Sequence, residues 1–178
     1  MVEDDSISKE DLARRVADVA TLDGTFVLRS GQTSHRYFDK YRFEGDPVLL
    51  KHLARGMSRL LPAETEILAG LELGGVPLVT AISLETGLPA AFVRKEAKTY
   101  GTCRALEGQD VGGRKVTFIE DIITTGGAVA DAYRLASQED AKVLAVVCAI
   151  WRGDGAPQVQ GAPGLPVLPL FTRGDLDG

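Results

Sequence analysis

The stretch that decides the fold runs from Lys115 to Ala128 and reads K-V-T-F-I-E-D-I-I-T-T-G-G-A. Its apolar run from Val116 to Ile119 is rich in β-branched and aromatic residues, which predicts a buried parallel strand. Two adjacent carboxylates, Glu120 and Asp121, end that run. A small-residue turn follows, and apolar spacing at 129, 132, 135 and 136 then predicts a helix. This order of elements is the layout of an anion-binding nest.

The turn reads Thr124-Thr125-Gly126-Gly127. Its backbone N–H groups, helped by the dipole of the following helix, would point at an anion, and the threonine hydroxyls add donors. The segment lacks the Gly-Lys-Ser/Thr of nucleotide-triphosphate loops and the glycine spacing of dinucleotide-binding turns. Carboxylates beside such a nest suit a ligand with hydroxyls and a phosphate, such as a ribose 5-phosphate. The alternative is an ordinary strand-to-helix turn with a surface-exposed acidic pair.

Composition limits the classes of protein that fit. The chain has 178 residues, 44% of them apolar, which predicts a single compact domain. A net charge of −5 argues against nucleic acid or an anionic membrane as the main partner. No apolar run is long enough to span a bilayer. Cys103 and Cys148 are too few for a disulfide scaffold or a zinc site, so a reducing, cytoplasmic setting fits best.

The rest of the chain alternates helices and strands, which predicts an α/β fold with a mostly parallel sheet covered on both faces. The first helix opens at Ser8 and ends at Gly24, and a second opens at Asp46-Pro47. Short strands are expected at 25–28, 37–39, 66–71, 90–93, 142–150 and 167–171. The turn Glu72-Leu73-Gly74-Gly75 repeats the strand, turn and helix layout and is a candidate for a second phosphate.

Positive charge concentrates after the strand at 90–93. Arg94, Lys95, Lys98 and Arg104 lie within eleven residues of a chain that is otherwise acidic. From Tyr100 onward there is little hydrophobic period, so a long mobile loop is predicted through Gly113, and loops of this length are usually lids or binding loops. The alternative is a solvated basic loop without a ligand.

Three segments resemble a known family. Residues 118–127, F-I-E-D-I-I-T-T-G-G, resemble the phosphoribosyl pyrophosphate (PRPP) motif of type I phosphoribosyltransferases. Residues 26–39, F-V-L-R-S-G-Q-T-S-H-R-Y-F-D, and 92–101, F-V-R-K-E-A-K-T-Y-G, resemble the orotate phosphoribosyltransferases among them. The resemblance implies a type I phosphoribosyltransferase fold in one domain, 1–178, with a small N-terminal hood (1–45), a core (46–152) and a mobile catalytic loop (94–113).

The resemblance also implies roles for individual residues. Lys98, Glu120 and Asp121 are the expected catalytic residues. Tyr37, Phe38, Thr124 and Arg152 are expected at orotate, with Arg152 on its carboxylate. Residues expected to bind PRPP are Arg29, Arg94, Lys95, Lys98, Tyr100, Glu120, Asp121, Ile122, Ile123, Thr124, Thr125, Gly126, Gly127 and Ala128. Tyr100 stands where many members have histidine. Leu73-Gly74 stands where some have an aromatic–lysine pair, so only backbone contacts are expected there.

The implied reaction is Mg²⁺-dependent transfer of the phosphoribosyl group from PRPP to N1 of orotate, giving orotidine 5′-monophosphate and pyrophosphate in pyrimidine synthesis. The metal would be held mainly by the diphosphate and water, without dedicated protein ligands. The resemblance further implies a homodimer whose loop reaches into the neighbouring site. Two alternatives stay open: a purine or xanthine phosphoribosyltransferase, and a PRPP-sensing regulator without activity.

Overall fold

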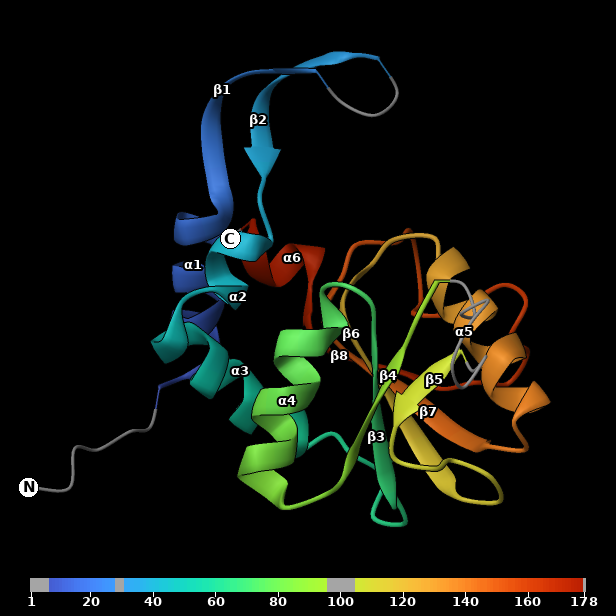
Figure 1. Ribbon diagram of the computed structural model, residues 1–178. Helices are drawn as coiled ribbons and strands as arrows, with labels where there is room; N and C mark the ends of the chain where they lie inside the picture. The colour runs from blue at the N-terminus through green and yellow to red at the C-terminus, as the bar shows by residue number, and fades with distance from the viewer. Residues whose placement is uncertain (1–6, 28–30, 96–104, 178) are drawn as a thin grey trace, which may run out of the picture.

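The computed structural model describes residues 7–27, 31–95 and 105–177. Its centre is a six-stranded sheet in the order β5-β4-β3-β6-β7-β8 (Figure 1). The strands are β3 (Ile67–Leu71), β4 (Ala90–Val93), β5 (Leu106–Gly108), β6 (Lys115–Ile123), β7 (Lys142–Trp151) and β8 (Val167–Thr172). All neighbouring pairs are parallel except β4 and β5. The expected mostly parallel sheet is therefore confirmed.

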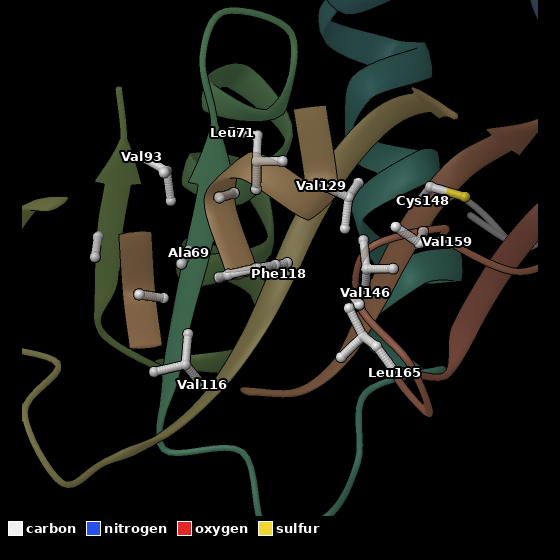
Figure 2. Packing of buried hydrophobic residues seen from close by; sticks show 14 of the residues in the cluster. Ala69, Leu71, Val93, Val116, Phe118, Val129, Val146, Cys148, Val159 and Leu165 are labelled. Atoms are coloured by element: carbon white, nitrogen blue, oxygen red, sulfur yellow. The ribbon is translucent and has the colours of Figure 1, made fainter. Parts of the chain in front are cut away.

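Helices cover both faces of this sheet, as expected. On one face lies α5 (Gly127–Gln138), and on the other pack α1 (Lys9–Ala20), α3 (Pro47–Ser58) and α4 (Gly75–Thr86) (Figure 1). Strand side chains alternate between two cores, since successive residues of a strand point to opposite faces. Phe118 joins the core under α5, whereas its neighbour Ile119 joins the core under α3 and α4. Figure 2 shows the first of these, with Val129 of α5 above Phe118 and Val146.

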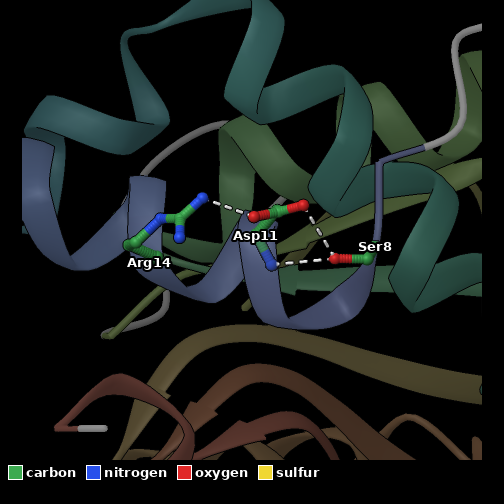
Figure 3. Close-up of polar contacts among 3 residues, drawn as sticks. All are labelled: Ser8, Asp11 and Arg14. Carbon is green, nitrogen blue, oxygen red and sulfur yellow. Dashed lines mark hydrogen bonds and ion pairs between the residues drawn. The ribbon is translucent and has the colours of Figure 1, made fainter.

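Two helices begin at the caps that the sequence predicts. Ser8 accepts a hydrogen bond from the backbone N–H of Asp11 at 3.0 Å and opens α1, and Arg14 forms an ion pair with the Asp11 carboxylate (Figure 3). Asp46 accepts from the N–H groups of Val48 and Leu49 and opens α3. Such caps satisfy donors that the first helical turn leaves free.

An antiparallel hairpin of β1 (Thr21–Val27) and β2 (Thr33–Phe38) projects from the body at the top of Figure 1. The prediction that Gly24 ends the first helix is wrong: α1 ends at Ala20, and Gly24 lies inside β1. Cross-strand pairing extends both strands beyond the short runs that the sequence suggested. A one-turn helix, α2 (Tyr41–Glu44), then leads back into the core and was not predicted.

Two further expectations need correction. The loop expected over 94–113 contains β5, because Leu106 and Val111 are buried and the strand pairs with β4. The strand expected to stop at Ile119 continues as β6 to Ile123, carrying the acidic pair inside the sheet. The chain closes with a short helix, α6 (Arg173–Leu176), also not predicted. Among the described residues, no helix has the length and apolar character that a bilayer crossing requires.

Candidate active site

The acidic pair lies near the carboxyl end of β6, at the centre of the sheet. Glu120 and Asp121 keep only 7% and 1% of their surface exposed, so the alternative of a surface-exposed pair is wrong. The pair lies inside the sheet, since β6 pairs with β7 through Glu120 and Cys148 and continues to Ile123. Asp121 donates its backbone N–H to Glu120 Oε1 at 2.9 Å. Carboxylates buried this deeply need partners from elsewhere in the chain.

Lys40 is that partner for Asp121. Its Nζ lies 2.5 Å from Asp121 Oδ2, and it stands immediately before α2, where the hairpin returns to the core. Burial by itself would lower the pKa of Lys40, but contact with the Asp121 carboxylate outweighs burial and raises that pKa. The lysine is therefore a cation beside a buried anion. Sequence reasoning missed this residue, because no local pattern relates it to β6.

Glu44, on α2, is the third carboxyl of the cluster. Only 5% of its surface is exposed, and within the described part of the chain neither of its carboxyl oxygens has a hydrogen-bond donor. Burial, reinforced by the neighbouring Asp121 carboxylate, raises the pKa of Glu44 to about 8. Burial and Asp121 also raise the pKa of Glu120 well above its ordinary value. Near neutral pH the cluster thus holds Glu44 mainly as the neutral acid, whose O–H can donate a hydrogen bond to the Asp121 carboxylate.

The turn between β3 and α4 packs directly against the Lys40–Asp121 pair. A Cβ at Gly74 would lie 1.4 Å from Asp121 Oδ2 and 3.0 Å from Lys40 Nζ, so a side chain there is excluded. Gly75 is equally constrained, since its Cβ would lie 2.4 Å from the Ile119 carbonyl oxygen. These glycines therefore bring the backbone of the candidate second phosphate turn next to the acidic pair.

The strand, turn and helix expected around the candidate phosphate nest are all present. Gly126 adopts a left-handed φ of 77° and precedes α5, and a Cβ there would meet Val159 at 2.9 Å. Thr124, Thr125 and Gly127 are exposed at the start of the helix, and Ala128 follows them, also exposed. The N-terminal N–H groups of a helix of this length offer a site for an anion. Ile122 and Ile123 instead direct their side chains into the two cores, which leaves them only backbone groups to offer.

Residues of the β1–β2 hairpin and Arg152, which follows β7, line a further pocket. The guanidinium carbon of Arg152 lies 5.0 Å from the centroid of the Phe38 ring. Its backbone N–H donates to the Ile123 carbonyl at 2.8 Å, which places Arg152 beside the acidic strand. Tyr37, Phe38 and Arg152 line one pocket of about 760 Å³. Three of the four residues expected at orotate thus line one pocket, whereas Thr124 is not among its lining residues.

Basic residues of the expected loop begin at the end of β4. Arg94 and Lys95 line a pocket of about 350 Å³ together with Ala128 of α5. Arg94 also lines a second pocket, of about 410 Å³, with Glu72 and Leu73 of the turn before α4. Arg94 therefore lies between the two turns. The expected roles of Arg29, Lys98 and Tyr100 concern positions outside the described residues.

Curated relatives of this chain include orotate phosphoribosyltransferases. A relative from Nocardioides sp., an orotate phosphoribosyltransferase, is 54% identical over 166 residues, covering 93% of each chain. Another from Methanopyrus kandleri, of the same name, is 38% identical over 97% of this chain and 93% of that protein. The chain belongs to the orotate phosphoribosyltransferase family. No protein-family model matches it.

Solved structures agree with this family. Orotate phosphoribosyltransferase of Mycobacterium tuberculosis, in complex with inorganic phosphate, superposes with a TM-score of 0.83 at 27% identity, covering 96% of this chain and 98% of that one. The same enzyme in complex with PRPP gives a TM-score of 0.81 at 26% identity, over 96% and 99% of the two chains. The chain thus has the type I phosphoribosyltransferase fold that its central motif predicts.

Proposed function

We propose that this protein transfers the 5-phosphoribosyl group from PRPP to N1 of orotate, releasing pyrophosphate and forming orotidine 5′-monophosphate for pyrimidine synthesis. One observation carries the proposal beyond the family: the acidic pair, the phosphate nest and Arg152 meet at one end of the central strands. Ligands of open α/β sheets bind at the carboxyl ends of their strands. Family membership at 54% identity supports the same reaction.

Each part of PRPP has a proposed partner. The 5′-phosphate binds the turn Thr124–Gly127 and the start of α5 at Ala128, where the first N–H groups of the helix and the exposed threonines offer donors. Asp121 and Glu120 accept hydrogen bonds from the ribose hydroxyls. The diphosphate lies between the Gly74 turn and the cations Arg94 and Lys95, which share their pockets with these turns.

Orotate is proposed to lie against the hairpin. Arg152 binds its carboxylate through two parallel N–H donors, and the Phe38 ring beneath that guanidinium holds it in place. Tyr37 and Thr124 complete the base site. Arg29, Lys98 and Tyr100 keep the roles that the family resemblance implies, with Lys98 next to the departing diphosphate. An arginine beside an aromatic ring favours a planar anion over a neutral purine.

The chemical task is electrostatic. Breaking the bond between C1 and the diphosphate builds positive charge on the ribose and negative charge on the leaving group, so fixed charges that match both lower the barrier. Asp121 lies on the ribose side, and Arg94 and Lys95 lie on the diphosphate side. No covalent intermediate is required, since the base nitrogen is itself the nucleophile. Excluding water from C1 prevents hydrolysis of PRPP.

Magnesium is proposed to arrive with the substrate. Among the residues that the structure describes, no group of three or more histidine, cysteine or carboxylate side chains is placed to hold a metal ion. Diphosphate oxygens and water are hard ligands of the kind that Mg²⁺ prefers, and the bound ion would neutralise charge on the leaving group.

The test is spectrophotometric. Protein, Mg²⁺, PRPP and orotate are mixed and the loss of orotate absorbance is followed, with adenine, hypoxanthine, xanthine and uracil in parallel reactions. Among these five bases, we expect turnover only with orotate. Turnover with a purine and none with orotate would reject the assignment, and PRPP binding without any turnover would favour the regulator.

We also propose that the protein acts as a cytoplasmic homodimer whose loop contributes Lys98 to the neighbouring site. Mixing a Lys98→Ala protein with an Asp121→Asn protein should then restore part of the activity, because hybrid dimers contain one site with both residues intact. If subunits are shown to exchange and no activity returns, the loop acts within its own chain.

A further inference from the structure

Lys40 joins three segments of the site. It follows the hairpin, its Nζ pairs with Asp121 of β6 at 2.5 Å, and it lies beside the Gly74 turn before α4. The hairpin is proposed to hold the base, β6 the ribose and the turn the diphosphate. An ammonium with three N–H donors at this junction has more hydrogen-bonding capacity than one carboxylate oxygen uses.

The two members of the ion pair differ in exposure. The Lys40 side chain keeps 32% of its surface exposed, whereas the Asp121 side chain keeps 2%. The Asp121 carboxylate is thus buried, and the Lys40 side chain is the partner that solvent or a ligand can reach. A ligand that approaches Asp121 meets Lys40 first.

Because residue 74 is a glycine, the Lys40 ammonium can lie close to the backbone of the turn before α4. A Cβ at Gly74 would stand 3.0 Å from Lys40 Nζ, so the ammonium lies against the backbone where a second phosphate is expected. The turn itself, Leu73-Gly74-Gly75, supplies no cationic side chain. A doubly phosphorylated leaving group bound there needs positive charge, and Lys40 is placed to provide it.

We propose that Lys40 is a PRPP-binding residue, which donates to the diphosphate at the Gly74 turn while it remains paired with Asp121. This inference rests on the proposed function, because it takes the ribose to lie at Asp121. It extends the site to a residue outside the sequence motifs.

The decisive comparison is between ligands with and without the diphosphate. Binding of PRPP, pyrophosphate and ribose 5-phosphate is measured by calorimetry with Mg²⁺ for wild type, Lys40→Met and the control Lys142→Met. Methionine keeps the length of the side chain without its charge, and Lys142 is exposed at the far end of β7. We expect Lys40→Met to weaken PRPP and pyrophosphate about 10- to 100-fold, the usual contribution of a hydrogen bond to a charged group.

Ribose 5-phosphate separates this role from a structural one. If Lys40 contacts the diphosphate, the affinity for ribose 5-phosphate changes less than threefold. If Lys40 only positions Asp121, all sugar-phosphate ligands weaken together while pyrophosphate does not, and the proposal is wrong. Tighter binding to Lys40→Met would show that the lysine competes with substrate, which also overturns it.

A second measurement on the wild-type protein covers the case in which Lys40→Met does not fold. Reductive methylation of lysines is followed by mass spectrometry, and pyrophosphate with Mg²⁺ should protect Lys40 but not Lys142. Equal modification with and without pyrophosphate would overturn the proposal. If wild type binds no PRPP at all, the proposed function fails and this inference with it, whereas wild-type binding that Lys40→Met leaves unchanged rejects only the role of Lys40.

Discussion

Replacing Glu44 by glutamine should remove a large part of the pH dependence of stability. Glu44 is buried beside Asp121, and its pKa is raised from 4.5 to about 8, first by burial and then by that carboxylate. An acid whose pKa is raised on folding contributes stability fully below its unfolded pKa, and this contribution is lost as the pH rises through the folded value. The affected window therefore runs from about pH 4.5 to about pH 8.

The size of the effect follows from the shift. Each unit of pKa is worth about 1.4 kcal/mol, so this carboxyl lowers the free energy of unfolding by up to roughly 5 kcal/mol above pH 8. Between pH 5 and pH 7 the loss amounts to roughly 2–3 kcal/mol by the same relation. Glutamine has nearly the same shape and does not titrate, and its NH₂ group can donate to Asp121 as the neutral acid does.

Urea denaturation of wild type, Glu44→Gln and the control Glu64→Gln from pH 5 to pH 8 tests the prediction. We expect wild type and the control, which removes an exposed carboxylate, to lose stability with pH in parallel. The Glu44→Gln protein should lose roughly 2–3 kcal/mol less between pH 5 and pH 7. It retains a residual slope, because Glu120 also has a raised pKa. Parallel curves for all three proteins would refute the reasoning that Glu44 is protonated by burial.

Other changes test single contacts. Gly74→Ala places a Cβ 1.4 Å from Asp121 Oδ2, so PRPP affinity measured by calorimetry should fall at least tenfold. The control is Gly112→Ala, whose Cβ meets its nearest neighbour at 3.6 Å, and this variant should bind PRPP normally. Arg152→Lys loses the second parallel N–H donor, so KM for orotate should rise about 10- to 100-fold while PRPP affinity is unchanged. A change in PRPP affinity alone would contradict the assignment of Arg152 to the orotate carboxylate. Glu139→Ala removes the acceptor of the backbone N–H groups of Ala105 and Leu106, each at 3.3 Å. The free energy of unfolding should fall by about 1–3 kcal/mol. An unchanged denaturation midpoint would show that these contacts contribute nothing.

Local signals in the sequence predicted most of the scaffold. The caps at Ser8 and Asp46, the strand at Ala90–Val93 and the turn before α5 all lie where short-range rules put them. Each of these features depends on residues within one or two turns of chain, so it can be read without knowing the fold. The same rules failed where pairing decides the outcome, as at β5, whose residues become a strand only beside β4.

The sequence by itself determined that the chain carries an acidic pair followed by a glycine turn, a basic segment after a strand, and an arginine at the end of another. Only the tertiary structure decided that Asp121 is buried, that Lys40 neutralises it and that Glu44 is forced toward its neutral form. These residues come from different segments, and no periodicity or spacing connects them. Burial and charge pairing depend on which segments the sheet brings together, and for this reason the electrostatics of the site required the fold.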